Sequence, residues 1–391
     1  MVKVASRGIT RAKEIYQNRD QRARELKAEG RQIMGYLCLY PVQEMMTAVD
    51  LVPYRMFGDV NETITEGNKL LPPNCCAFLR STLDLGMKGK YDFLTGAVFA
   101  HICEVGQRVH QIWRVAVNLP YTHYIDTPHL IRPESVEQHR DLLREFQGTL
   151  ESLTGKTMTT ARLKKAIRIH NQQRALVREL YELRKADPPL ISGVEVLQVL
   201  KAVMSIPIDE GNELLKETID EVKNRQDGPT KKAGRLLVWG PVVDYTGLPE
   251  MIESLDANIV MDDTCVGSRP FMEDVELTAD PLDGLAYHYL VDLKCARTVR
   301  GDAVFGATKK DYGTYKEFRF GYVGNYVKGW NVNGVIIETM RYCDSHGYEL
   351  PILRDYLDSL NVPHISVEND YSEAALAPLR TRIQGFLEVI S

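Results

Sequence analysis

The sequence predicts an α/β protein in which two parallel-sheet domains stand on either side of a helical section. A chain of 391 residues is too long for one ordinary core, which favours two domains. Short apolar runs alternate with helical patterns near both ends, as in parallel sheets. The middle is dense in Glu, Arg, Lys, Leu and Gln, with apolar residues at helical spacing. We therefore expect an N-terminal helix and first α/β domain over residues 1–132, a helical section over 133–230 and a second α/β domain over 231–391.

The first domain is predicted to consist of strand–helix units that follow a charged N-terminal surface helix. Residues 35–40 form a short predicted strand, and Pro41 opens the next helix. A second unit begins with the apolar run 51–57, and residues 91–100 supply a buried parallel strand. Cys103 therefore lies just beyond the carboxyl end of a strand.

The second domain follows a boundary near residue 230, where the polar run 223–232 contains a Gly-Pro pair. Strands are predicted over residues 235–240, 258–263, 334–339 and 364–368, with helices over 248–255 and 351–360. This order is a βαβ pattern. In such sheets ligands bind outside the carboxyl ends of the strands, which is where Cys103, Cys265 and Cys343 fall.

The amino-acid composition limits the classes of protein to which this chain can belong. Hydrophobic residues make up 44% and charged residues 26%, as in soluble globular proteins, and the formal charge of -5 offers no general attraction to nucleic acid. No run approaches the roughly 18 apolar residues of a membrane span. Residues 9–33 carry several acidic side chains, which argues against a targeting peptide. We expect a cytoplasmic protein with a small-molecule or protein partner, without nucleic acid or membrane.

The chain has seven cysteines, and an odd number without a secretion signal is poorly explained by disulfides. Reduced thiols, inert or metal-bound, are the alternatives. Cys76 and Cys103 lie 27 residues apart and Cys343 a further 240 residues on, so the sequence has neither a ferredoxin-like run nor the paired spacing of zinc sites. Spacing alone therefore favours thiols that are packed as small apolar side chains.

The local sequence around the cysteines changes this interpretation. Residues 76–81 (CAFLRS) and 89–94 (GKYDFL), followed by Cys103, resemble the 2-hydroxyacyl-CoA dehydratase and benzoyl-CoA reductase family. Further segments resemble signatures of that family in the same order: 35–38 (GYLC), 53–58 (PYRMFG), 261–269 (MDDTCVGSR), 341–344 (RYCD) and 368–372 (ENDYS) with 380–382 (RTR). The resemblance covers nearly the whole chain except the helical section.

The resemblance implies that Cys76, Cys103 and Cys343 hold a [4Fe–4S] cluster between two Rossmann/flavodoxin-like domains. Cys75 competes with Cys76 for this role, and the four-residue spacing to Arg80 favours Cys76. An iron without a cysteine ligand is open to water, sulfide or substrate, which suits direct chemistry on a thioester as well as electron storage.

One three-cysteine cluster leaves Cys265 and Cys295 unexplained. With Cys38 or Cys75 they complete six thiols, enough for the double-cubane [8Fe–9S] cluster described for relatives in this superfamily. The alternative is that they are packed thiols beside a single cluster. Glu104, directly after the second ligand, replaces the Asp often found in family dehydratases, and it is interpreted either as an acid–base group or as a helix N-terminal residue.

The sequence lacks the glycine-rich loops that bind nucleotide phosphates. The resemblance therefore implies separate iron–sulfur ATPase subunits, with ferredoxin as the indirect electron donor. Four basic residues are candidates for the phosphates of coenzyme A or are plain solvated charges: Arg80, Arg269, Lys294 and Arg297.

Within the family the chain looks most like the smaller cluster-bearing, non-ATPase subunit of an ATP-dependent benzoyl-CoA reductase. That implies an oxidoreductase of anaerobic aromatic catabolism, which dearomatises an aryl-CoA thioester as a heterotetramer with a homologous cluster-bearing subunit and the ATPase subunits. The alternatives are a 2-hydroxyacyl-CoA dehydratase subunit, which recycles one electron in a radical dehydration, and a non-catalytic electron-relay subunit. Cys265 and Cys295 favour the reductase. Catalytic acid–base residues are not assigned.

Overall fold

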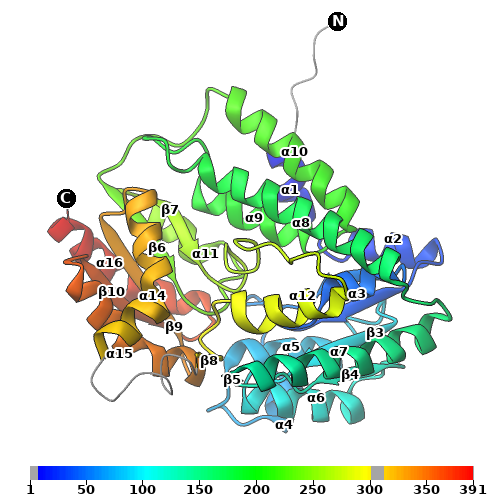
Figure 1. The fold of residues 1–391 in the computed structure, drawn as a ribbon. Helices are drawn as coiled ribbons and strands as arrows, with labels where there is room; N and C mark the ends of the chain where they lie inside the picture. The colour runs from blue at the N-terminus through cyan, green and yellow to red at the C-terminus, as the bar shows by residue number, and fades with distance from the viewer. Residues whose placement is uncertain (1–7, 301–311, 391) are drawn as a thin grey trace, which may run out of the picture.

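The computed structural model describes residues 8–300 and 312–390, and its described part is an α/β fold with two four-stranded parallel sheets (Figure 1). The predicted fold class is confirmed. The first sheet has the order β2-β1-β3-β4. Its strands are β1 (Ile33–Tyr36), β2 (Val52–Arg55), β3 (Gly96–Ala100) and β4 (Thr122–Ile125).

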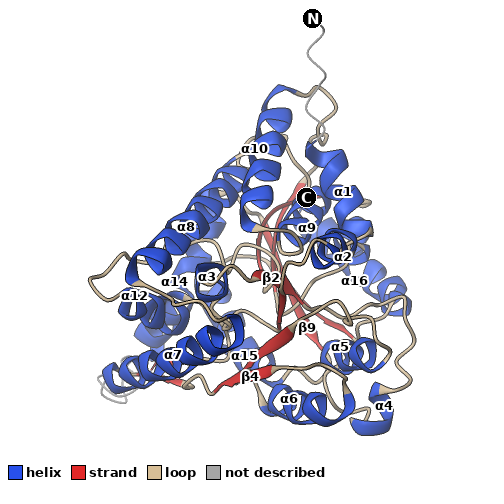
Figure 2. Cartoon of the chain, turned by 90° about the vertical axis from the view of Figure 1, so that its right-hand side faces the viewer, coloured by secondary structure: helices blue, strands red, loops and turns tan. Residues whose placement is uncertain are grey.

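The second sheet has the order β10-β9-β6-β7, again all parallel. Its strands are β6 (Gly234–Trp239), β7 (Ala257–Asp263), β9 (Gly334–Met340) and β10 (His364–Asn369). A short parallel pair, β5 (Leu130–Ile131) with β8 (Val299–Arg300), joins segments far apart in the chain. Every residue of β3 and β6 is buried, because helices cover both faces of the sheets (Figure 2).

The described helices fall into three groups along the chain. The first group is α1 (Gly8–Gln17), α2 (Gln21–Ala28), α3 (Gln43–Ala48), α4 (Gly67–Leu70), α5 (Ala77–Met87) and α6 (Glu104–Ala116). The second is α7 (Pro133–Thr154), α8 (Thr160–Glu182), α9 (Gly193–Val203) and α10 (Ile208–Asn224). The third is α11 (Gly247–Glu253), α12 (Pro281–Tyr287), α14 (Tyr312–Gly329), α15 (Asp344–Ser359) and α16 (Leu376–Ile390), with a π-helical turn η1 (His288–Asp292) and a 3-10 turn η2 (Glu373–Ala375).

Helices of the middle group contact both sheets. Helix α7 packs beside β4 of the first sheet, and α9 packs beside β7 of the second. In Figure 1, helices α8, α9 and α10 lie above the strands β3 and β4 of the first sheet, and α8 and α9 stand at the height of β7 of the second sheet. This part of the molecule therefore braces the two sheets against each other.

Two predicted helices differ from the structure. The N-terminal segment, predicted as one solvated helix, is broken into α1 and α2, and α1 packs on α9 and α10 with Ala12 fully buried. Helix α15 begins at Asp344 rather than at Pro351. Proline suits a helix start, but Pro351 is exposed and the helix continues through it. The earlier start matters because it places Cys343 at the N-terminus of the helix.

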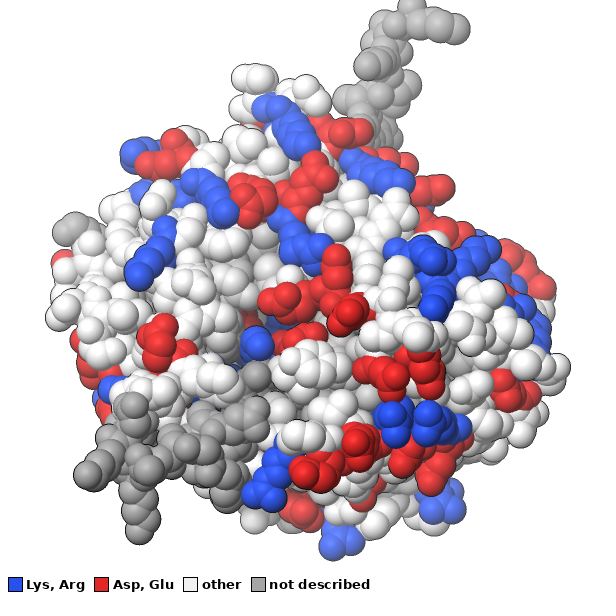
Figure 3. All heavy atoms as spheres, in the orientation of Figure 1, with Lys and Arg blue, Asp and Glu red and all other residues white. Residues whose placement is uncertain are grey.

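On the face drawn in Figure 3, lysine and arginine side chains alternate with acidic ones, in keeping with the small net charge. None of the described helices has the length and apolar character needed to cross a membrane.

Candidate metal centre

A cavity lies where the carboxyl ends of strands from both sheets face each other. Six of the seven cysteines line it. Five of them lie in segments that follow β1, β3, β7, β9 or η1, and the sixth directly precedes α5. These six are Cys38, Cys76, Cys103, Cys265, Cys295 and Cys343. Cys75 does not line the cavity. The structure thus brings together all three predicted primary ligands and three further thiols, and it places Cys38 rather than Cys75 with Cys265 and Cys295.

The first cysteine group, defined as Cys76, Cys103 and Cys343, has one structural feature in common. Each is the N-cap residue of a helix: α5, α6 and α15, respectively. The Cys103 Sγ accepts a hydrogen bond from the backbone N–H of Gly106 at 3.3 Å. Because a helix N-terminus presents unpaired N–H groups and a positive dipole, three such termini stabilise negative charge on these sulfurs.

Burial opposes that ionisation in the protein without metal. It raises the pKa of Cys76 to about 12, while the backbone N–H of Leu79 acts in the opposite direction. It also raises the pKa of Cys103 and takes that of Cys343 well above its usual range, with the Cys76 thiol adding to the effect on Cys343. These cysteines are therefore protonated thiols at neutral pH, and binding of a cation there displaces protons.

Cys38, Cys265 and Cys295, the second cysteine group, line the same cavity. Cys38 has a φ of 75°, a left-handed conformation that costs a side-chain-bearing residue about 1–2 kcal/mol. Such strain is concentrated at functional positions. Burial and then the neighbouring Cys265 and Cys295 thiols raise the pKa of Cys38, while burial raises that of Cys265 to about 11 despite the opposing charge of Arg269.

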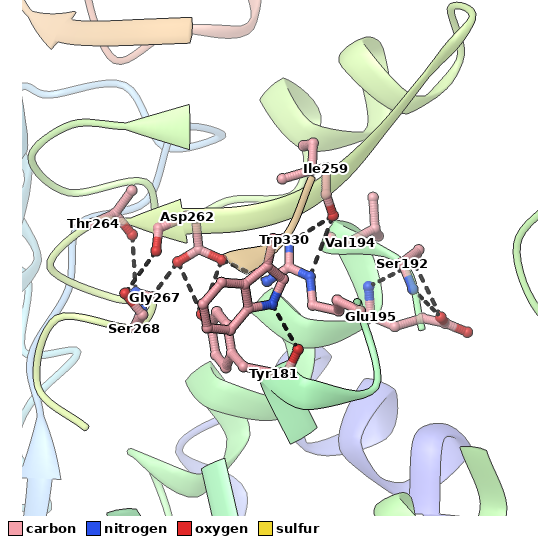
Figure 4. A network of polar contacts seen from close by, with 12 residues as sticks. Tyr181, Ser192, Val194, Glu195, Ile259, Asp262, Thr264, Gly267, Ser268 and Trp330 are labelled. Carbon is pink, nitrogen blue, oxygen red and sulfur yellow. Dashed lines mark hydrogen bonds and ion pairs between the residues drawn. The ribbon is translucent and has the colours of Figure 1, made fainter. Parts of the chain in front are cut away.

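The turn that carries Cys265 is fixed by Asp262 at the end of β7 (Figure 4). The Asp262 carboxylate accepts hydrogen bonds from the Ser268 backbone N–H at 3.0 Å and from the Tyr181 hydroxyl at 2.9 Å. Gly267 packs so tightly here that an added Cβ would lie 1.7 Å from Asp262 Oδ1. Only glycine fits this position without moving the turn.

Arg269, on the same turn, is buried and uses all five of its guanidinium hydrogens. Its Nε donates to Asp263 Oδ1 at 2.9 Å, and its Nη2 donates to the carbonyls of Gly240 and Asp263 at 3.1 and 2.7 Å. Its Nη1 donates to Cys265 Sγ and to His346 Nε2, both at 3.3 Å. The cation therefore hydrogen-bonds directly to a cysteine sulfur of the cavity.

Other arginines near the cavity also donate their hydrogen bonds to protein acceptors. Arg55 donates to the Cys265 carbonyl at 2.6 Å, and Arg297 lines the cavity and donates to the carbonyls of Pro128 and Thr127. Because Arg269 and Arg297 are buried among protein acceptors, the structure does not support their assignment to the phosphates of coenzyme A.

The two remaining basic candidates, Arg80 and Lys294, lie near cavity cysteines in the sequence. Arg80 donates to the Cys75 carbonyl at 3.0 Å and to Asn68 Oδ1 at 2.6 Å. Lys294 is half-buried beside Cys295. Glu104 is exposed as the first residue of α6, the position expected for a residue that favours the helix dipole.

Apolar side chains form the rest of the cavity wall. Phe78, Leu79, Ile102, Val105 and Met340 line it, and the Cys76 thiol lies 3.4 Å from Met340 Sδ. Within residues 8–300 and 312–390, no three His, Cys, Asp or Glu side chains are arranged to hold a single metal ion. The arrangement is a mainly apolar chamber with six sulfur donors distributed around it.

Comparisons with known proteins agree with the sequence motifs. A family model described as 2-hydroxyglutaryl-CoA dehydratase, D-component, matches residues 38–390. A benzoyl-CoA reductase subunit of Thauera aromatica is 25% identical over 391 residues, covering 98% of this chain and 97% of its own. Lactoyl-CoA dehydratase subunit beta of Anaerotignum propionicum is 24% identical over 387 residues, covering 98% of each chain. (R)-2-hydroxyglutaryl-CoA dehydratase subunit beta of Acidaminococcus fermentans is 25% identical over 371 residues, covering 93% of each chain.

Proposed function

Because the chain belongs to the 2-hydroxyglutaryl-CoA dehydratase D-component family, we propose that it is an iron–sulfur subunit of an enzyme complex that acts on a coenzyme A thioester. The single observation that carries this proposal is the cavity with six cysteines between the two sheets. The finer proposal is a subunit of an ATP-dependent benzoyl-CoA reductase, which dearomatises an aryl-CoA.

The donor set fits an iron–sulfur cluster better than a single ion. Three thiolates of a cluster bind three different irons, so they need not converge on one point as the ligands of zinc do. The first cysteine group would hold a [4Fe–4S] unit. The second group would hold another, as in a double-cubane [8Fe–9S] cluster. A low-potential cluster bound there supplies single electrons to the substrate.

The residues of the chain provide the setting for that chemistry. Helix N-termini at the first group and buried arginines at the second offset the negative charge of six thiolates. The apolar walls limit the access of water to the sulfurs, which would lower the reduction potential of a bound cluster. A low potential is what reduction of an aromatic ring requires.

The second candidate function is a 2-hydroxyacyl-CoA dehydratase subunit. It is favoured by the dehydratase relatives, whose identities of 24% and 25% equal or approach that of the reductase relative. The reductase is favoured by the second cysteine group, because one cluster with three cysteine ligands leaves Cys38, Cys265 and Cys295 without a role. A third candidate is a non-catalytic electron-relay subunit.

The proposal includes partners. The catalytic unit is completed by a homologous cluster-bearing protein, and iron–sulfur ATPase subunits deliver electrons that come from ferredoxin, within a cytoplasmic heterotetramer. The substrate is an aryl-CoA thioester.

The test is anaerobic purification followed by iron and sulfide analysis and EPR spectroscopy. We expect about eight irons per chain for the double cluster and about four for a single one. Cys75→Ser and Cys76→Ser form a matched pair of adjacent substitutions: the first should keep the iron content of the wild type, and the second should lower it. An iron-free wild-type protein, or equal iron in Cys76→Ser, would refute the proposal.

The substrate is tested with the assembled complex. A reductase consumes two electrons for each aryl-CoA converted, whereas a dehydratase needs only catalytic electrons for a 2-hydroxyacyl-CoA. Full turnover by a complex that contains Cys343→Ala would favour the electron-relay role and contradict a catalytic one for this chain.

A further inference from the structure

Two side chains connect the two cysteine groups. Arg269 Nη1 lies 3.3 Å from both Cys265 Sγ and His346 Nε2. His346, in the first turn of α15, places its other ring nitrogen, Nδ1, 3.5 Å from Cys343 Sγ. The chain Cys265–Arg269–His346–Cys343 therefore runs from a sulfur of the second group to a sulfur of the first.

The direction of these hydrogen bonds follows from the chemistry of the groups. A guanidinium has no acceptor, so His346 Nε2 must accept from Arg269 with its lone pair. An imidazole that accepts at Nε2 carries its single proton on Nδ1. The Nδ1–H then points at Cys343 Sγ as a donor, within the distance of a hydrogen bond to sulfur.

Burial makes this arrangement rigid. Arg269 is 5% exposed and His346 is 4% exposed, and the Trp239 ring packs against the imidazole with centroids 5.2 Å apart. Because Asp263 and Gly240 hold the other donors of Arg269, the guanidinium has no freedom to turn away from His346.

We propose that Arg269 and His346 are positioning residues that set the potential of the cluster, by donating one hydrogen bond to a cysteine sulfur of each group and by tying the two groups together. This inference rests on the proposed function, because it concerns a cluster bound by these cysteines. Hydrogen bonds to the sulfurs stabilise the more negative, reduced state and raise the reduction potential. Arg269 also acts on Cys343 at a distance, because it fixes which nitrogen of His346 carries the proton.

The experiment is an EPR-monitored redox titration of the anaerobically purified holoprotein. His346→Leu removes the donor to Cys343 without stranding a buried charge. At the wild-type midpoint, its ratio of reduced to oxidised cluster should fall about tenfold, equal to about 59 mV for a one-electron couple. His346→Asn keeps an amide N–H near the position of Nδ1 and should recover most of the shift.

Arginine variants test the tie between the groups. Arg269→Lys should shift the potential in the same direction, and its effect added to His346→Leu should be smaller than the sum of the two single effects. Arg235 is a matched control because it is buried and donates to backbone carbonyls, including those of Ala186 and Trp330. It is the second residue of β6, at the amino end of the strand, whereas the cavity lies at the carboxyl end. Arg235→Lys should leave the potential unchanged.

The outcomes separate the inference from the proposed function. A wild-type protein without iron refutes the function. Iron at the wild-type level with unchanged potentials in both His346 variants overturns the inference alone. Loss of iron from both His346 variants with an unchanged circular dichroism spectrum also overturns it, because the side chain would then serve only to hold the loop.

Discussion

Gly267→Ala should disrupt the turn that carries Cys265. The new Cβ would lie 1.7 Å from Asp262 Oδ1 and 2.8 Å from Thr264 Oγ1. The carboxylate has no room to withdraw, because Tyr181 and Arg184 hold it at 2.9 and 2.8 Å from their donor atoms. Losing one hydrogen bond to this charged group costs about 1.5–3 kcal/mol. The overpacking adds about 1–3 kcal/mol.

The expected total loss in the free energy of unfolding is therefore about 2.5–6 kcal/mol. Urea unfolding followed by circular dichroism measures it, and iron analysis of the same preparation shows whether Cys265 is still placed to bind. Gly148→Ala is the matched control, because its Cβ meets nothing within 4 Å in the exposed middle of α7. Alanine there should stabilise the protein by about 1 kcal/mol. A Gly267→Ala protein within about 1 kcal/mol of the wild type, with full iron, would refute the steric reasoning.

Two further predictions concern pH and metal removal. Burial alone would raise the pKa of Glu44, but Arg174 and His170 lower it to about 2, below the usual value of 4.5. Its contribution to stability is thus complete above about pH 4.5 and is lost as the pH falls towards 2. Glu44→Gln should remove this part of the pH dependence of the free energy of unfolding. It should also cost about 3–5 kcal/mol at pH 7, because Arg174 would keep a buried charge without its partner. If the free energy of unfolding of Glu44→Gln still fell with pH as steeply as that of the wild type, Glu44 would not be the group responsible. Under the proposed function, removal of the cluster by an anaerobic chelator should lower the melting temperature by several degrees, because the cavity cysteines follow strands of both sheets. An equal melting temperature would argue against a cluster that joins the two sheets.

Much of the fold is visible in the sequence because both sheets are buried on both faces. Strands such as β6 and β9 are almost entirely buried and contain the apolar runs 236–239 and 335–337, which makes them easy to recognise. The same logic places Cys103, Cys265 and Cys343 at one edge of the sheets, where the structure has them. Local pattern is less informative for α15, since proline at Pro351 is equally compatible with a helix start and with an exposed interior position.

The parts that could not be predicted depend on contacts between distant residues. The choice between Cys38 and Cys75 is made by a left-handed residue after β1, and a cysteine in that conformation has no signal of its own in the sequence. Arg269 and His346 are 77 residues apart, so nothing in either segment shows that they meet. Arg269 resembles a phosphate ligand in the sequence because buried and exposed arginines look alike until their acceptors are known.

The spread of the cavity cysteines along the chain also bears on how the protein is made. The first group is complete only when Cys343 has been synthesised, and the second group only when Cys295 has. A growing chain on the ribosome therefore has neither full set until most of it has been translated. Under the proposed function, cofactor insertion follows translation, and a product that terminates before Cys295 lacks the ligands to retain it.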